Sequence, residues 1–268
     1  GNITGGNVLF GSGIVSGTGN ITAIDTLRAG TNSLTVNTGG TVTLAGVISG
    51  ALSVTGSAIT LNNDITTSGS QSYTGPVSLT ANLVFDSTTS SSNGAVSFSS
   101  TVNSATSTAR NLSVVAGSGN VTFTGAVGNL NPLGAIAIDS TGTTTFGSTV
   151  NAASLATNAG GTTSLGGNVT TTGSQTYSDA VVLTTNVTLD ASAITTSNTI
   201  SASSYNLTLV SDALALGAAV NGGVGTITIK PHSANTTIGL GDGAVGVLHL
   251  SNTELGYINN SGNNFAAI

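Results

Sequence analysis

Apolar and polar residues alternate along most of the chain, and the alternation comes in short runs. Every second position is aliphatic or aromatic, with Thr, Ser or Asn between, in "SLTVN" (Ser33 to Asn37), "TVTL" (Thr41 to Leu44), "NVTF" (Asn120 to Phe123), "NLTLV" (Asn206 to Val210) and "TITIK" (Thr226 to Lys230). A period of two predicts β-strands with one buried and one solvent-facing side. Gly-rich and Asn-rich turns such as "NTGG" and "NAGG" separate the runs, and helical periodicity with caps is lacking. The sequence predicts an all-β fold with essentially no helix.

Two segments recur far along the chain. "TTSGSQSYTGPVSL" (Thr66 to Leu79) matches "TTTGSQTYSDAVVL" (Thr170 to Leu183) without a gap at an offset of 170 − 66 = 104, with eight of fourteen positions identical. The match continues to Asp86 and Asp190. A second echo pairs Ser33 to Gly46 with Ser154 to Gly167, at an offset of 154 − 33 = 121. The chain is therefore built from internal repeats.

Shorter spacings define a smaller repeat unit. Leu34 and Leu52 stand at an offset of 52 − 34 = 18. Ile136 with Leu155 and Phe146 with Leu165 stand at offsets of 155 − 136 = 19 and 165 − 146 = 19. A period near 20 built only from strands and turns predicts a parallel β-solenoid, since an antiparallel sandwich would not give it. We expect one continuous solenoid over 1–268, with about thirteen coils and a length near 60 Å at the usual strand spacing.

Internal modules fall at roughly 1–62, 63–166 and 167–268, with 225–268 as a distinct C-terminal segment. The offset of 104 corresponds to about five coils of this length. Natural solenoids cover their end coils with caps, and neither end of the sequence shows one. That leaves a piece of a longer rod, or copies that stack end to end into a filament.

The composition limits the partners. Nine acidic and three basic residues give a net charge of −6, which leaves no basic patch for nucleic acid. Cysteine is absent, so disulfides and thiolate metal sites are excluded. No apolar run is long enough for a transmembrane helix, and the first residues lack the basic and apolar regions of a signal peptide. We expect no membrane insertion, and a secreted chain would be a mature or internal piece.

The repeat words resemble a known family. "GSQTYSDAVVLTTNVTLDAS" (Gly173 to Ser192), "NLSVVAGSGNVTFTGAVG" (Asn111 to Gly128) and the segment from Gly225 to Ile258 are similar to repeats of filamentous-haemagglutinin-like bacterial exoproteins. This resemblance covers most of the chain. It implies a right-handed parallel β-helix, export across the outer membrane of a Gram-negative bacterium, and a role in adhesion or extracellular structure.

The residues suited to catalysis or ligand binding are few and scattered. The single lysine, Lys230, follows Ile229 rather than Gly, which excludes a P-loop, and "GDGAVG" (Gly241 to Gly246) is a chance match to a dinucleotide motif with no helix after it. Asp242 alone cannot form a calcium site. We predict no catalytic, cofactor-binding or metal-binding residue. The other polar residues considered are the repeated carboxylates Asp86 and Asp190, about 24 Å apart if separated by five coils, and the pairs His249 with Glu254 and Lys230 with His232, interpreted as isolated exposed residues.

Three functions remain open. The first is a non-enzymatic structural or adhesive rod at the bacterial cell surface or secreted from it, whose partners are other copies of itself and host or matrix glycans. Tyr73 and Tyr177 are either exposed platforms for such glycans or packing residues at equivalent positions of two modules. The second is a polysaccharide-active enzyme, which requires at least two carboxylates in one groove. Ice binding is the third, and a Thr-x-Thr at one fixed position of every coil is not visible in the sequence.

Overall fold

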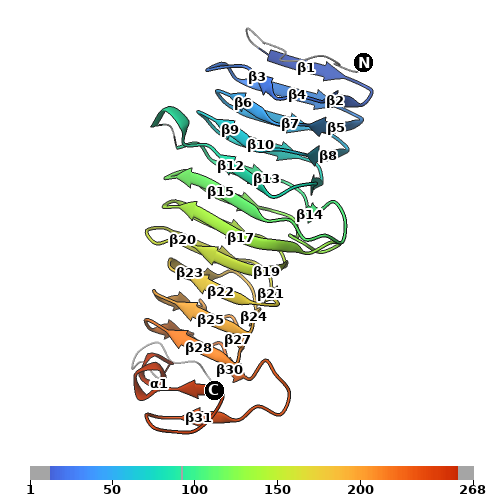
Figure 1. Ribbon diagram of the computed structural model, residues 1–268. Coiled ribbons are helices and arrows are strands. Elements are labelled where there is room, and N and C mark those ends of the chain that lie inside the picture. Colours follow the sequence, from blue (N-terminus) through green and yellow to red (C-terminus); the bar gives the residue numbers. More distant parts are fainter. Residues whose placement is uncertain (1–12, 92, 259–268) are drawn as a thin grey trace.

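The computed structural model describes residues 13–91 and 93–258 and forms a rod of stacked coils (Figure 1). Every pairing between its described strands is parallel. Most coils contribute a strand to each of three lengthwise faces, here called faces 1, 2 and 3. The expected parallel β-solenoid is confirmed, and one seven-residue α-helix and one 3₁₀ turn (η1, Thr89–Ser91) are the only described helical segments.

The strands are assigned to the faces by their pairing partners. Face 1 contains β1 (Gly13–Gly17), β4 (Leu34–Thr38), β7 (Leu52–Thr55), β10 (Gln71–Thr74), β13 (Val96–Phe98), β16 (Val121–Phe123), β18 (Thr143–Phe146), β20 (Thr162–Leu165), β23 (Ala180–Leu183), β26 (Ile200–Ser201) and β29 (Val220–Asn221). Face 2 contains β2 (Ile21–Ala23), β5 (Thr41–Leu44), β8 (Ala58–Leu61), β11 (Val77–Leu79), β14 (Val102–Ser104), the start of β19 (Val150–Thr157), β21 (Val169–Thr171), β24 (Val187–Asp190), β27 (Leu207–Val210) and β30 (Ile227–Lys230). Face 3 contains β3 (Leu27–Arg28), β6 (Val47–Ser49), β9 (Ile65–Thr67), β12 (Leu83–Asp86), β15 (Leu112–Gly117), β17 (Leu133–Ser140), the end of β19, β22 (Ser174–Tyr177), β25 (Ala193–Thr196) and β28 (Ala213–Leu216).

Alternation along the strands builds the core. On a typical strand such as β7 the residues are in turn buried and half-buried, so that the aliphatic side chains point inward. Successive coils then stack like on like, and Leu34 pairs with Leu52, Ile136 with Leu155 and Phe146 with Leu165. These are the three pairs that the sequence singled out, so the short repeat is confirmed as the coil register.

Asparagine at the starts of strands links one coil to the next. The Asn186 side-chain oxygen accepts the Asn206 amide of the following coil at 2.9 Å, and the Asn206 side-chain oxygen accepts the Thr226 amide at 2.9 Å. Such bonds satisfy backbone donors where the chain turns a corner. They explain why so many strands of this chain begin with Asn.

The coils vary in length. Leu34, Leu52 and Gln71 are successive register partners at offsets of 52 − 34 = 18 and 71 − 52 = 19. Gln71, Val96 and Val121 follow at the longer offsets of 96 − 71 = 25 and 121 − 96 = 25. Face 1 consequently holds eleven strands in the described residues, and the expectation of thirteen coils is wrong.

Two features of the chain account for the smaller number of coils. The longer middle coils use up chain, and the residues after Lys230 leave the stack. Eleven coils correspond to a rod of about 50 Å. The sequence-based interpretation of residues 1–12 lies outside the described range.

Two eight-residue strands in the middle of the rod reorganise its faces. Both β17 and β19 run across the corner between faces 2 and 3. The start of β19 pairs with β21 and its end pairs with β22, so the sheet divides there into two branches. Beyond this point each face continues separately to β28, β29 and β30.

The last described residues fold across the end of the coil stack. β31 (Ile238–Leu240) and β32 (Leu248–Leu250) pair with each other, and α1 (Asn252–Ile258) packs against β28, β29 and β32. Ser251 precedes the helix, and its hydroxyl and backbone amide both donate to Glu254 Oε2, at 2.8 and 2.9 Å. The Glu254 amide in turn donates to Ser251 Oγ at 3.3 Å, and this reciprocal cap fixes the first turn of the helix. The expectation that the C-terminal part of the sequence lacks a capping element is therefore wrong.

Candidate functional site

The repeated tyrosine words form a buried hydrogen-bonded pair. The side chain of Gln71 is fully buried, and its Nε2 donates to Asp86 O at 2.9 Å and to Ile65 O at 3.4 Å. Tyr73 is also fully buried, and its hydroxyl donates to Gln71 Oε1 at 2.9 Å. One side chain thus connects three strands of two adjacent coils. Burial without a charged partner raises the pKa of the Tyr73 hydroxyl well above its ordinary value.

The second copy repeats these three bonds, but it lacks the further bond that Gln71 Nε2 donates to Thr67 Oγ1 at 3.2 Å. Gln175 Nε2 donates to Asp190 O and Val169 O, both at 3.0 Å, and the Tyr177 hydroxyl donates to Gln175 Oε1 at 3.0 Å. Each partner stands at the offset of 104 from its counterpart in the first copy. Neither tyrosine is an exposed glycan platform, so that interpretation is wrong and the alternative of a packing residue is confirmed.

The two copies nevertheless occupy different faces. Tyr73 lies on β10 in face 1, whereas Tyr177 lies on β22 in face 3. The second copy is four coils and two strands further along, because the middle coils are long and β17 and β19 cross a corner. The expectation of five whole coils, with equivalent positions in the rod, is therefore wrong. The other repeated segment shows the same shift: its first copy lies on faces 1 and 2 (β4 and β5), and its second copy lies on faces 3 and 1 (the end of β19, and β20).

Aromatic rings form a continuous stack inside face 1. Tyr73 stacks on Phe98 with ring centroids 4.9 Å apart, and Phe98 stacks on Phe123 at 4.9 Å. Phe123 continues to Phe146 at 5.2 Å, and the three interplanar angles are 10°, 4° and 3°. Phe85 of face 3 meets Tyr73 edge to face at 5.5 Å. Stacked and edge-to-face rings are the favoured geometries for aromatic pairs, so these contacts stabilise this part of the core.

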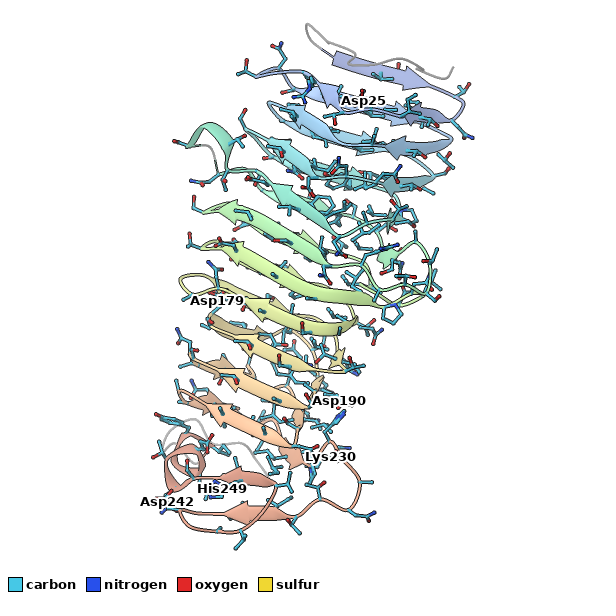
Figure 2. The ribbon with its side chains drawn as sticks, viewed as in Figure 1. Asp25, Asp179, Asp190, Lys230, Asp242 and His249 are labelled. Atoms are coloured by element: carbon cyan, nitrogen blue, oxygen red, sulfur yellow. The ribbon has the colours of Figure 1, made fainter. Side chains whose placement is uncertain are left out.

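The acidic residues are spread along the rod and serve the fold (Figure 2). Each carboxylate is hydrogen-bonded to a backbone or side-chain group of the protein: Asp25, Asp64, Asp86, Asp139, Asp179, Asp190, Asp212, Asp242 and Glu254. Asp86 binds the amide and hydroxyl of Thr88 at 2.8 and 2.7 Å. Asp86 ends a strand of face 3 and Asp190 a strand of face 2, so they are not a catalytic dyad.

One corner near β30 brings two carboxylates to the same residue. Asp190 Oδ1 lies 2.7 Å from His232 Nδ1, and Asp212 Oδ1 accepts the backbone amide of His232 at 2.9 Å. Asp212 also accepts the hydroxyl and amide of Ser233, which hold the pKa of its carboxyl below the ordinary value. An ionised carboxylate occupied by three donors suits the anchoring of a turn rather than proton transfer. His232 is therefore not an isolated residue, as the sequence suggested, while Lys230 ends β30 with an exposed side chain.

Asp179 is the one carboxylate that is completely buried. Its two oxygens accept the Gly161 amide at 2.7 Å and the Thr163 hydroxyl at 3.3 Å. Burial raises the pKa of this carboxyl, and the two donors act in the opposite direction. The aligned position of the first copy is Gly75, with φ of +127°, where a Cβ would lie 2.1 Å from Gly56 O. The two corners therefore differ: at Gly75 the backbone of the preceding coil leaves no room for a side chain, whereas at Asp179 a side chain fills the corner.

The remaining candidates lie in the C-terminal segment. His249 Nε2 is 2.9 Å from Gly241 O, and Glu254 Oε1 accepts the amide of Leu216 at 3.1 Å. The interpretation of His249 and Glu254 as isolated exposed residues is wrong, because both tie the segment together. Asp242 accepts the backbone and side-chain nitrogens of Asn252 at 3.1 Å each, so "GDGAVG" is part of the β31–β32 connection.

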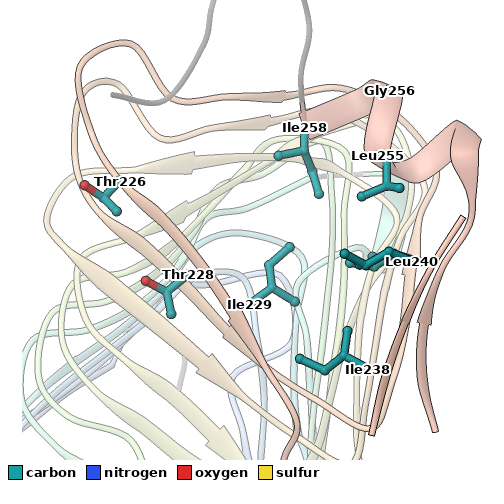
Figure 3. A pocket seen from close by; sticks show the side chains of 9 residues that line it. Thr226, Thr228, Ile229, Ile238, Leu240, Leu255, Gly256 and Ile258 are labelled. Atoms are coloured by element: carbon teal, nitrogen blue, oxygen red, sulfur yellow. The ribbon is translucent and has the colours of Figure 1, made fainter. Parts of the chain in front are cut away.

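An apolar cavity of about 880 Å³ lies between β30, β31 and α1 (Figure 3). Six of the nine residues in its walls are Ile or Leu, and the full set is Thr226, Thr228, Ile229, Ile238, Leu240, Leu250, Leu255, Gly256 and Ile258. The side chains of Ile229, Leu255 and Ile258 converge on it in Figure 3. No charged group of the described residues lines the cavity.

The outer side of face 1 carries paired hydroxyl residues, here called the hydroxyl array. It comprises Ser53 with Thr55, Ser72 with Thr74, Ser97 with Ser99, and Thr122 with Thr124. Ser53, Ser72, Ser97 and Thr122 are consecutive register partners on four adjacent strands, and one row continues to Thr35, Thr145 and Ser164. A hydroxyl-x-hydroxyl pair therefore does recur at a fixed position in these coils. Sequence inspection missed it because the coils differ in length, so the pairs recur at unequal intervals along the chain.

Comparison of the chain with protein-family models, with curated proteins and with solved structures gave no match. Within the described ranges, no helix is long and apolar enough to cross a bilayer. Nor do three or more His, Asp or Glu side chains of these ranges gather as metal ligands would. The fold and its surfaces are what remains to guide a functional proposal.

Proposed function

We propose that this chain is a non-enzymatic structural or adhesive rod of a secreted or cell-surface bacterial protein. The observation that carries the proposal is how the polar side chains are used. All nine carboxylates and both Gln–Tyr pairs are bonded to the fold itself, as described above. A chain whose polar groups join its coils and fix its turns is suited to spanning distance and presenting repetitive surfaces.

Two further observations support the proposal. The repeat words resemble those of filamentous-haemagglutinin-like exoproteins, in which a β-helical rod serves attachment. The far edge of β30 has no strand partner among the described residues, and the apolar cavity lies beside it. The C-terminal cap packs on β28 and β29 and, in the part of the chain that the structure describes, does not pair with β30. An unpaired strand edge is a template for another strand, so we propose that copies associate end to end through β30. Host or matrix glycans are the other proposed partners.

Negative-stain imaging of the purified chain, together with binding to bacterial or host cells, tests this proposal. We expect either long uniform fibres or short rods of about 50 Å that bind cells. Leu240→Asp, at a residue 62% exposed beside the cavity, should abolish fibres, whereas Leu130→Asp, at a residue 77% exposed in a loop before β17, should not. Rods that neither associate nor bind, combined with cleavage of a polysaccharide, would reject a structural role.

A further inference from the structure

We propose that the hydroxyl array on face 1 binds ordered water at the surface of ice. This goes beyond a role as a passive rod and does not depend on self-assembly. The starting observation is that eight Ser and Thr side chains occupy two parallel rows on four consecutive coils, with the register given above. Ser99 and Thr124 extend the second row, because their amides continue the ladder to Tyr73 O and Phe98 O at 3.0 and 2.9 Å.

The core fixes the spacing between coils in this region. Tyr73, Phe98 and Phe123 lie between the paired hydroxyl residues of their own strands and point inward, and their centroids are 4.9 and 4.9 Å apart. Along each strand the two hydroxyl residues are two positions apart, which is about 6.6 to 6.8 Å. The array therefore repeats in two directions. Hexagonal ice exposes rows of water oxygens with two repeats of similar size.

The array is held rigid before any ligand arrives. The three rings are fully buried and stacked within 10° of parallel, and the ladder of β7, β10, β13 and β16 has no register shift. Four of the eight residues are β-branched Thr, whose restricted side chains cost little entropy to order. Preorganisation of this kind favours binding to a solid whose atoms cannot adapt to the protein.

The chemistry of the surface distinguishes among partners. No outward residue of β4, β7, β10, β13, β16, β18 or β20 is charged or aromatic. Anionic glycans would require cations, and most sugar recognition uses aromatic platforms. Hydroxyls both donate and accept, as water does. Among the eight hydroxyls, only Ser97 donates to another described residue, to Gln71 O at 3.4 Å. The others are free to bond to a lattice of water.

Thermal hysteresis and adsorption of the labelled full chain to a single ice crystal test this inference. We expect wild-type protein to adsorb and to shape the crystal. Thr74→Lys and Thr124→Lys, at exposed positions of the array, should abolish adsorption. The matched variants Thr170→Lys and Thr195→Lys, at exposed threonines of faces 2 and 3, should retain it. Circular dichroism of all four variants is the control for folding.

Three results would overturn the inference. One is the absence of hysteresis and adsorption in folded wild-type chain. Another is equal loss of adsorption in the face 1 variants and in those of faces 2 and 3. The third is adsorption to microcrystalline cellulose with none to ice, which would assign the array to a polysaccharide surface. Because fibres and cell binding are scored separately, failure here leaves the proposed rod function standing, and the reverse also holds.

Discussion

Replacing Gln71 by leucine tests whether the buried Gln–Tyr pair stabilises the rod through its hydrogen bonds. Leucine is close to glutamine in size, so the change leaves little cavity. It does leave Asp86 O and the Tyr73 hydroxyl without the partners that lie at 2.9 Å from each. A buried polar group that loses its partner costs about 1–3 kcal/mol, so the two together give a loss of about 2–6 kcal/mol. Tyr73→Phe, which orphans only Gln71 Oε1, should cost about 1–3 kcal/mol.

Urea unfolding followed by circular dichroism measures both losses, and hydrogen exchange at β9 and β10 detects local opening if the coils do not unfold together. The double variant should lose less than the sum of the single losses, because the two side chains share one bond. Gln175→Leu should cost about as much as Gln71→Leu, or slightly less because only Gln71 also bonds to Thr67 Oγ1, although Gln175 lies on a different face. Unchanged stability of either variant, or a large difference between them, would refute the idea that the local network sets the energy.

Three further predictions follow from particular residues. Asp179→Asn should raise the free energy of unfolding at pH 7 but leave it unchanged below pH 4. Burial raises the pKa of the Asp179 carboxyl in the folded protein, so the neutral carboxyl stabilises the fold fully below the pKa of the unfolded chain, about 4, and this contribution is lost as the carboxyl ionises at higher pH. If the urea midpoints of wild type and Asp179→Asn differ by the same amount at every pH, this reasoning is wrong. Gly75→Ala should destabilise strongly, since its Cβ would meet a backbone oxygen at 2.1 Å, whereas Gly19→Ala, with nothing within 4 Å, should melt like wild type. Glu254→Ala should speed hydrogen exchange of the Leu216 amide, and Glu254→Gln, which keeps the acceptor, should do so far less.

Local pattern was enough to predict the coil. Alternation depends only on which residues face the core, and stacking places like residues above one another, so the pairs at Leu34, Ile136 and Phe146 predicted the observed register. The number of coils was not predictable in the same way. Loops such as 105–111, between β14 and β15, lengthen a coil without changing its strands, and a polar loop gives no sign of how far the chain travels.

For the candidate sites, too, the sequence predicted the local pattern but not the three-dimensional position. Gln71 and Tyr73 could be recognised as a repeated word, but whether they face the core depends on the coil around them. A polar Gln is expected to face solvent until Tyr73 and two carbonyls are seen to satisfy it. The hydroxyl array was hidden because its members recur at unequal intervals, set by one shorter and two longer coils. Only the three-dimensional register aligns them.

In-register stacking of unequal coils is the central claim, and thiol cross-linking tests it most directly. The chain has no cysteine, so Ser72→Cys with Ser97→Cys creates one pair on adjacent strands of face 1, within the region of longer coils. Ser72→Cys with Thr176→Cys pairs the equivalent positions of the two repeated words, which lie on faces 1 and 3. A linker spanning about one strand spacing should join the first pair rapidly in folded protein and the second pair not at all. Efficient cross-linking of the second pair, or none of the first, would contradict the register on which this account rests.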